Sequence, residues 1–294
     1  MTVLRARISV AFPGAAAPVL DGVPLHLAAG EVVALVGESG SGKTLLARAI
    51  AGCLPAEARL DGGLEVAGRV GLIAQAPRET LVPVLAVGQQ IRAVLHARGA
   101  RAGAEAVAAL LRRVGLAPEV GGMLPQALSG GMAQRVAVAL ALAAEAAVLI
   151  ADEPTSALDG PAAAMVLALL AAEARAGRAV LVITHDLALA AAHSDRIVVM
   201  HAGQAVEEGP AASVIGAPAH PYTRALVAAS PAMARRLSDL AEMPGHPPDP
   251  AHPLPPCRFA PRCARRQAQC DAGRIGLRPF AEGEGRRLAC VEPG

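Results

Sequence analysis

The sequence predicts an α/β fold built around a buried parallel sheet, and two stretches carry this prediction. In the first, the apolar run 32–36 leads into a glycine-rich loop and then into a segment rich in alanine and leucine with helical character. In the second, the apolar run 147–151 ends in two carboxylates. Short, uninterrupted apolar runs are typical of parallel strands that are buried on both faces. In such sheets ligands bind at the carboxyl ends of the strands, where both stretches carry their polar groups.

The composition limits which residues can fill the core and which partners the chain is expected to bind. The chain has 294 residues, enough for one large domain or two modest ones. Its 27 Lys and Arg residues nearly balance 25 Asp and Glu residues, so the formal net charge of +2 implies no strongly charged partner. Aromatic residues make up only 1 % of the chain, which requires Ala, Val and Leu to fill the core and argues against base-stacking surfaces. We therefore expect no nucleic-acid partner.

The N-terminal residues favour a strand. Apolar and polar residues alternate over residues 4–10, and this period of two predicts a half-buried strand. The alternative is a signal peptide, which is disfavoured because Pro13 and Gly14 would break its apolar segment. Elsewhere no apolar run approaches the roughly 20 residues that a membrane-spanning helix needs.

Residues 37–44 form the strongest local motif, Gly-Glu-Ser-Gly-Ser-Gly-Lys-Thr between a strand and a helix. It fits the phosphate-loop pattern G-x-x-x-x-G-K-[ST], in which backbone N–H groups and a helix N-terminus surround phosphates. Lys43 would supply positive charge at the β- and γ-phosphates, and the Thr44 hydroxyl would ligate Mg²⁺. An ordinary glycine-rich turn is the alternative, but both flanks match the nucleotide-binding pattern. The predicted nucleotide-binding residues are Gly37, Ser39, Gly40, Ser41, Gly42, Lys43 and Thr44.

Asp152 and Glu153 follow the second apolar run. At the end of a buried strand Asp152 would hold the Mg²⁺ shell, and Glu153 would polarise the attacking water as a general base. The same two carboxylates could instead begin a helix, whose N-terminus favours negative charge. These two residues alone do not decide between the alternatives.

The order of further motifs along the chain decides between these two interpretations of Asp152 and Glu153. Gln75 follows a strand-like run, Leu-Ser-Gly-Gly occupies 128–131, Ser-Ala-Leu-Asp occupies 156–159, and His185 follows the apolar run 179–184. With the phosphate loop and the carboxylate pair, these motifs resemble the ATP-binding-cassette (ABC) ATPases in order and spacing. The resemblance implies an ABC-type P-loop NTPase: a RecA-like core, an antiparallel β subdomain and a helical subdomain that carries the signature sequence.

This resemblance implies roles for individual residues. Gln75 would sense Mg²⁺ and the γ-phosphate, and His185 would contact the γ-phosphate. Ser129 and Gly131 would contact ATP held by an opposing subunit, and Asp159 would cross the interface between the two. The implied catalytic residues are Glu153, His185 and Gln75, and the implied Mg²⁺ ligands are Thr44, Gln75 and Asp152.

Domain limits follow from the same comparison of motifs. Residues 1–230 are expected to form the nucleotide-binding domain, with the helical subdomain at about 76–130, and residues 231–294 a short irregular extension. Phe12 lies where the family often places an aromatic ring under adenine. Simple core packing is an equal alternative for that ring.

Two further stretches narrow the family. Residues 219–231 (AHPYTRALVAASP) and 72–91 resemble the ATPases of oligopeptide and dipeptide importers and their nickel relatives, with departures at Ala76 and Val82. The resemblance implies an ATPase that energises a bacterial importer from the cytoplasmic face of the inner membrane. Peptides are the favoured cargo, nickel or a metal chelate is the alternative, and a soluble ABC ATPase without a transport role is the alternative of another class.

The implied partners are another ATPase subunit, two transmembrane permease subunits and, indirectly, an extracytoplasmic substrate-binding protein. Met132 stands where one of two paralogous ATPases usually carries Gln, so a heterodimer is favoured over a homodimer. The sequence does not identify the transported substrate, because substrate choice lies in other subunits.

Cysteines gather at the C-terminal end of the chain. A cytosolic location keeps thiols reduced, which disfavours a disulfide. The spacing lacks the C-x₂₋₄-C pairs of zinc fingers and suits a [4Fe–4S] cluster better, with zinc as the second choice and unligated thiols as the remaining alternative. The proline-rich segment before them lacks a core of its own, so a metal would stabilise it, and nearby arginines would offset the charge of the cluster. Cys53 is expected to be a small core residue. The expected iron–sulfur ligands are Cys257, Cys263, Cys270 and Cys290.

Overall fold

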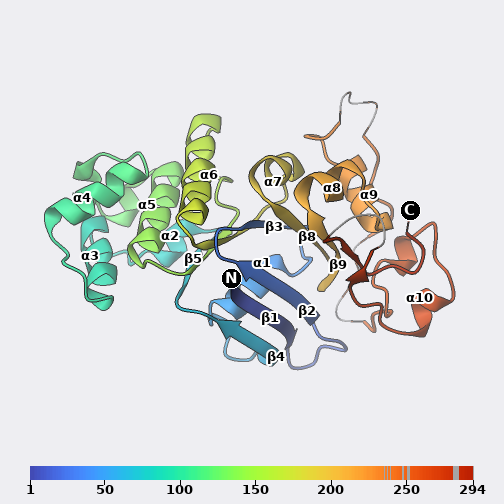
Figure 1. Cartoon of the computed structure of the whole chain (residues 1–294). Coiled ribbons are helices and arrows are strands. Elements are labelled where there is room, and N and C mark those ends of the chain that lie inside the picture. The colour runs from blue at the N-terminus through green and yellow to red at the C-terminus, as the bar shows by residue number, and fades with distance from the viewer. Residues whose placement is uncertain are drawn as a thin grey trace. The chain divides into compact units, whose positions relative to one another are not determined.

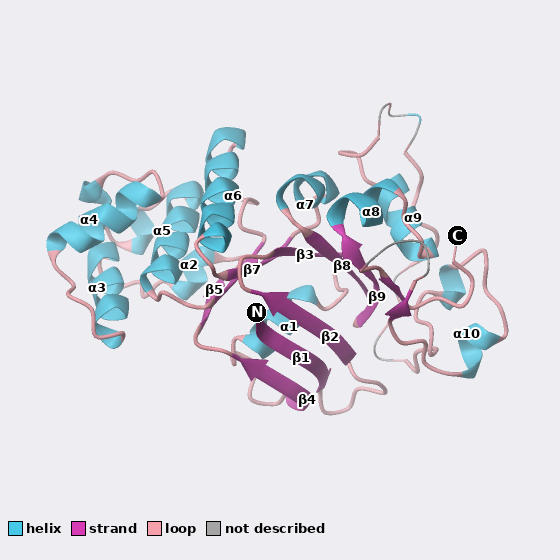
Figure 2. Cartoon of the chain, viewed as in Figure 1, coloured by secondary structure: helices cyan, strands magenta, loops and turns pink. Residues whose placement is uncertain are grey.

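The chain divides into two compact units in its computed structural model, which describes residues 1–234, 236, 238, 240–246, 248–249, 252–280 and 285–293 (Figure 1). Unit 1 comprises residues 1–3, 28–31 and 66–182, and unit 2 comprises residues 4–27, 32–65 and 183–294. Both units combine strands with helices, as the sequence predicts for an α/β protein (Figure 2). Among the described residues, no helix has the length and apolar character needed to span a bilayer.

A three-stranded sheet in unit 2 begins the chain. Its order is β2-β1-β4, with β1 at Thr2–Ala11, β2 at Leu20–Ala28 and β4 at Arg59–Val66. Along β1 the apolar side chains at even positions from 4 to 10 are all buried. The predicted N-terminal strand is therefore confirmed, and its alternation reflects one buried face.

The other strands of unit 2 lie in the order β3-β8-β9-β11-β10. β3 and β8 are parallel, and β8 and β9 form an antiparallel hairpin. The hairpin turn is Ala202-Gly203, with φ of +45° and +80°, as a two-residue turn with both φ values positive requires. The strands are β3 Val32–Val36, β8 Arg196–His201, β9 Gln204–Pro210, β10 Arg278–Pro279 and β11 Arg287–Leu288.

Helices of unit 2 cover these strands and connect them. α1 ends at Ile50, because Gly52 takes a left-handed conformation (φ +69°) and the Cys53 N–H bonds back to the Arg48 carbonyl at 2.8 Å. Cys53 therefore lies beyond the helix and is exposed, so its prediction as a core residue is wrong. The helices are α1 Lys43–Ile50, α7 Leu187–His193, α8 Ala211–Gly216, α9 Pro221–Ala228, α10 Gln269–Ala272 and a 3₁₀ turn at Ala260–Arg262.

Unit 1 holds strands in the order β7-β6-β5, and β5 and β6 are parallel. β6 and β7 are buried along their whole length, as predicted for a sheet covered on both faces. The strands are β5 Val70–Ile73, β6 Val148–Asp152 and β7 Ala179–Ile183. The helices are α2 Pro77–Thr80, α3 Val87–Ala97, α4 Ala104–Arg113, α5 Gly130–Ala143 and α6 Gly160–Arg175, with 3₁₀ turns at Pro118–Gly122 and Pro125–Ala127.

Helices α2, α3 and α4 and the two 3₁₀ turns lie within residues 76–130, and the helical subdomain expected there stays a prediction. Leu, Ile, Val and Ala side chains dominate the described core, as the composition requires. Two aromatic side chains, Tyr222 and Phe259, are buried together in one cluster of unit 2. The predicted domain boundary between residues 230 and 231 stays a prediction.

Candidate functional site

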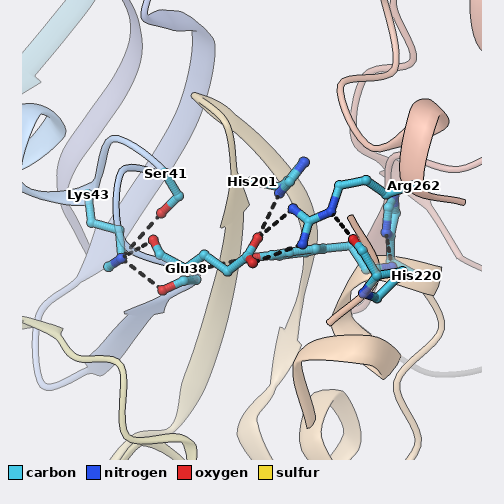
Figure 3. A network of polar contacts seen from close by, with 9 residues as sticks. Glu38, Ser41, Lys43, His201, His220 and Arg262 are labelled. Carbon is cyan, nitrogen blue, oxygen red and sulfur yellow. Dashed lines mark hydrogen bonds and ion pairs between the residues drawn. The ribbon is translucent and has the colours of Figure 1, made fainter. Parts of the chain in front are cut away.

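The phosphate loop of unit 2 runs from the end of β3 to the start of α1. Lys43 is 9 % exposed. Its ammonium group donates to the carbonyl oxygens of Gly37 and Glu38 at 2.9 and 2.8 Å and to Ser41 Oγ at 3.2 Å (Figure 3). Lys43 is also the first residue of α1, so its charge and the N–H groups of the helix start lie in the same loop. The loop therefore holds together the groups that are predicted to bind phosphates.

Two glycines of the loop are required by space and backbone conformation. Gly37 has φ +152°, and a Cβ there would lie 2.1 Å from the Met200 carbonyl oxygen. Gly42 has φ +97°, and a Cβ there would lie 2.6 Å from Leu20 Cδ2. Neither position accepts a side chain without a shift of its surroundings. Strand β8 and the start of β2 thus fix the path of the loop.

Unit 2 also contains His185, Thr44 and Phe12. His185 is exposed in the loop between β7 and α7, and the preceding Thr184 N–H donates to the Leu35 carbonyl at 3.3 Å. The loop that carries His185 therefore begins beside β3, the strand that leads into the phosphate loop. Thr44 is half-buried at the second position of α1, and Phe12 is half-buried just after β1. The role of Phe12 stays open.

Asp152 and Glu153 lie in unit 1, at the end of β6, and are 2 % and 8 % exposed. Glu153 has φ +49°, a conformation that few residues other than glycine adopt. The backbone N–H and the hydroxyl of Ser156 both donate to the Glu153 carbonyl, at 3.3 and 3.1 Å, and hold this turn. Strained backbone of this kind costs about 1–3 kcal/mol and concentrates at functional sites.

The signature sequence and the loop that follows the carboxylates meet within unit 1. Ser129 begins α5 and accepts a hydrogen bond from the Met132 N–H at 3.2 Å. A Cβ on Gly131 would lie 3.3 Å from Leu158 Cδ2, so the start of α5 rests on the loop 156–159. Asp159 begins α6 in the same way, accepting the Ala162 N–H at 2.9 Å. Ser129 and Asp159 are both exposed, which leaves them accessible to another subunit.

The predicted site residues therefore fall into two groups. Unit 2 holds the phosphate loop, Phe12, His185 and the four tail cysteines, and unit 1 holds the remaining residues. Gln75, which follows β5, is exposed in unit 1. The residues in unit 1 are Gln75, Ser129, Gly131, Asp152, Glu153 and Asp159.

Known proteins share both the motifs and the tail. The ABC transporter family profile matches residues 20–156, and a profile described as the C-terminal region of oligopeptide/dipeptide transporters matches residues 206–270. The oligopeptide transport ATP-binding protein AppD of Bacillus subtilis is 36 % identical, over 93 % of this chain and 90 % of its own length. The chain belongs to the oligopeptide/dipeptide family of ABC transporter ATP-binding proteins. The dipeptide transport ATP-binding protein DppD of Escherichia coli is 37 % identical, over 98 % of this chain and 95 % of DppD.

Solved ABC cassettes share the fold. The dimeric cassette MJ0796, in a post-hydrolysis state with ADP and phosphate, is 27 % identical with a TM-score of 0.64, over 71 % of this chain and 98 % of that chain. A structure described as the ATP-binding subunit of an ABC transporter has the same identity and TM-score and covers 72 % of this chain and 91 % of that chain. The ABC ATPase fold and the ATPase activity predicted from the sequence are thus confirmed.

The phosphate loop of this ABC ATPase has two partners that no sequence motif indicates. The Tyr222 hydroxyl accepts the Glu38 N–H at 2.8 Å, and Arg262 forms an ion pair with the Glu38 carboxylate. Tyr222 belongs to the stretch 219–231, which served only to indicate the family. This stretch is fixed by Glu207, whose two carboxylate oxygens accept the N–H groups of Ala219 and His220 at 3.0 and 2.9 Å. Neither periodicity nor a motif connects Glu38 with residues so far away in sequence.

Four cysteines of the C-terminal extension, residues 231–294, which we call the tail, lie near one another without forming a recognisable metal site. All four are free thiols. Burial, with smaller contributions from the neighbouring thiols of Cys270 and Cys290, raises the pKa of Cys257 to about 11. Burial also raises the pKa of Cys290, with contributions from Cys263 and Cys270. Among the described residues, however, no three His, Cys, Asp or Glu side chains are placed to hold a metal ion, so the predicted iron–sulfur cluster is not supported.

The C-terminal extension was expected to need a metal because it lacks a core of its own, and this expectation is wrong. The tail does bury part of itself, because Phe259 is 3 % exposed and packs against His201 and Tyr222 with ring centroids 5.4 Å away in both cases. Arg258 and Arg262, expected to offset a cluster's charge, are instead directed at backbone carbonyls and at Glu38. The C-terminal extension is therefore anchored on the rest of unit 2 by its own side chains.

Proposed function

We propose that this chain is the ATP-hydrolysing subunit of an importer of dipeptides or oligopeptides. One observation carries the proposal: similarity to peptide-transport ATP-binding proteins extends over nearly the whole chain and includes the C-terminal region. As an ABC importer ATPase, the chain works as a peripheral subunit on the cytoplasmic face of the membrane. It works with permease subunits and a substrate-binding protein.

Exposed apolar residues support the contact with the permease subunits. Val82, Val84 and Leu85 follow Gln75 and α2, and their exposed fractions are 45 %, 78 % and 37 %. Large apolar side chains gathered at the surface mark sites where proteins associate. The association with a paralogous ATPase in a heterodimer is proposed from Met132 alone. A homodimer is the alternative.

The proposed catalytic arrangement uses two cassettes. Lys43 and the N–H groups of the loop bind the phosphates of ATP, and Thr44, Gln75 and Asp152 hold Mg²⁺. Glu153 takes a proton from the attacking water, and His185 contacts the γ-phosphate. The second cassette supplies the residues equivalent to Ser129 and Gly131, whose exposure at the start of α5 supports contact with another subunit.

Uptake of labelled dipeptides by a bacterial strain that carries this gene tests the proposed function. Deleting the gene should abolish ATP-dependent uptake of labelled dipeptides, and the wild-type chain should restore it. Lys43→Ala should not restore uptake, because the triphosphate loses its main compensating charge. Loss of nickel uptake with unchanged peptide uptake would instead indicate the alternative cargo. Normal uptake of both would favour an ABC ATPase outside transport.

A shared metal site of Cys257, Cys263, Cys270 and Cys290 is proposed as a finer feature, with a [4Fe–4S] cluster first and zinc second. The influence of neighbouring thiols on the pKa values of Cys257 and Cys290 supports it. Without a metal, the raised pKa values of Cys257 and Cys290 keep these two thiols protonated at neutral pH, and metal binding would have to release their protons. Anaerobic purification should give a brown protein with about four irons per chain, as a Cys₄ cube requires. Metal-free protein with four titratable tail thiols would refute it.

A further inference from the structure

We propose that Arg262, in the C-terminal extension, is a positioning residue of the phosphate loop that neutralises Glu38 and directs its carboxylate away from bound ATP. The C-terminal extension thereby sets the affinity of the ATPase for its nucleotide. This inference rests on the proposed role of the phosphate loop in binding ATP and adds a residue that the motifs do not include. Glu38 is the second residue of the loop itself, whereas Arg262 is 224 residues away in sequence.

The contact between the two side chains is bidentate. Arg262 Nη1 lies 2.8 Å from Glu38 Oε2, and Nη2 lies 2.9 Å from Oε1, which is the fork geometry that Arg forms with a carboxylate. The Arg262 side chain is 4 % exposed and the Glu38 side chain 20 %. Figure 3 shows the Glu38 side chain extending from the loop toward Arg262, on the side away from Lys43. The pair is therefore a shielded, directed contact rather than a surface ion pair.

Arg262 is itself held in place by the rest of the tail. Its Nε donates to the Pro244 carbonyl at 2.5 Å, and its guanidinium lies 5.6 Å from the centre of the Phe259 ring. Phe259 in turn packs against Tyr222, whose hydroxyl accepts the N–H of Glu38. The backbone and the carboxylate of Glu38 thus each have a partner, from α9 and from the tail.

Charge explains why the loop needs this partner. A carboxylate in a loop that binds a triphosphate repels the ligand unless a positive charge compensates it. Burial alone would raise the pKa of Glu38, but the hydrogen bonds from His201 and Arg262 and the charge of Arg262 lower it to about 2, so the group is ionised at neutral pH. His201 Nδ1 lies 3.6 Å from Oε2, yet burial lowers the pKa of His201 and keeps it neutral. Arg262 therefore carries the compensating charge.

A second arginine of the tail supports the other end of the loop. The Arg258 guanidinium donates to the carbonyls of Ala202 and Pro18, the latter at 2.9 Å. In the same hairpin turn, the Gly203 N–H donates to the Ser41 carbonyl at 2.9 Å. The segment from Arg258 to Arg262 therefore reaches the loop at Glu38 directly and at Ser41 through the turn. A tail that only covered the surface would not need both contacts.

The test measures the dissociation constant of ATP, with Mg²⁺, for the full-length chain and four variants. Arg262→Gln should weaken binding by about tenfold or more, because the Glu38 charge then acts on the triphosphate uncompensated. Arg262→Lys, which keeps the charge but not the fork, should fall between this variant and the wild type. Adding Glu38→Gln to Arg262→Gln should restore affinity to within about threefold of the wild type, since both charges are then absent. Arg266→Gln is the matched control, because its partner Asp271 lies in the exposed tail.

Recovery in the double variant separates electrostatic positioning from simple packing. If the double variant bound ATP as weakly as Arg262→Gln, the tail would act only through packing and the proposal would be wrong. Wild-type affinity of Arg262→Gln, in protein of unchanged melting temperature, would also overturn it. If the wild-type chain itself failed to bind ATP, the proposed nucleotide site would fail, which is a different result from a normal wild type with unaffected variants.

Discussion

Glu153→Gln is expected to bind ATP normally and to hydrolyse it at least ~10²-fold more slowly, since a positioned general base contributes about that much to the rate. The substitution keeps the size of the side chain and removes only its ability to accept the proton of the attacking water. Glu153 is 8 % exposed, so little bulk water is available to replace it in that role. Single-turnover hydrolysis and nucleotide affinity, measured on the same preparation, separate the two effects.

Glu145→Gln is the matched control for this experiment. Glu145 lies in unit 1 as well, has φ of +45° close to the +49° of Glu153, and undergoes the same chemical change. Its side chain is 59 % exposed and pairs with Arg98, and neither residue belongs to a predicted site motif. We expect wild-type turnover from this variant. Equal turnover of Glu153→Gln and wild type would show that another group accepts the proton.

Local patterns account for the part of the fold that the sequence predicted. The alternation over residues 4–10 and the apolar run 32–36 each specify one element through contacts of neighbouring residues. The glycines of the phosphate loop are specified in the same way, because backbone conformation and close approach exclude other residues. Such requirements are visible in a short stretch of sequence.

Contacts between distant residues account for what the sequence did not predict. The pair of Glu38 and Arg262 joins the first and last thirds of the chain, and no periodicity records it. The extension was expected to be irregular and without a core, yet β11 pairs with β9 and Phe259 is buried. The error on Cys53 has a local cause, because Gly52 takes a left-handed conformation and α1 ends at Ile50, which leaves Cys53 beyond the helix.

The second large effect concerns the signature sequence, and Ser129→Asp tests it. Aspartate begins a helix as well as serine does, so α5 should remain intact. Its negative charge would face the γ-phosphate of ATP in the opposing subunit, and turnover should fall by about 10²-fold, given the repulsion of two charges near a protein surface. Ser129→Asn caps the helix without the charge and should retain most of the activity.

Where the chain pairs with itself, in the homodimer that is the alternative to the proposed heterodimer, mixing two inactive variants shows whether the signature acts across the dimer. Dimers of Lys43→Ala lack nucleotide at both sites, and dimers of Ser129→Asp carry the unwanted charge at both. In a mixed dimer, the intact phosphate loop of the Ser129→Asp chain meets the intact signature of the Lys43→Ala chain. If the signature acts in trans, one site in each mixed dimer is complete and the mixture regains activity that neither variant has alone. If the signature acted within its own chain, every site would carry one defect and mixing would restore nothing. Dilution adds an independent measurement, because the rate per chain should fall as dimers dissociate. A constant rate per chain, from protein shown to be monomeric, would mean that one cassette hydrolyses ATP by itself.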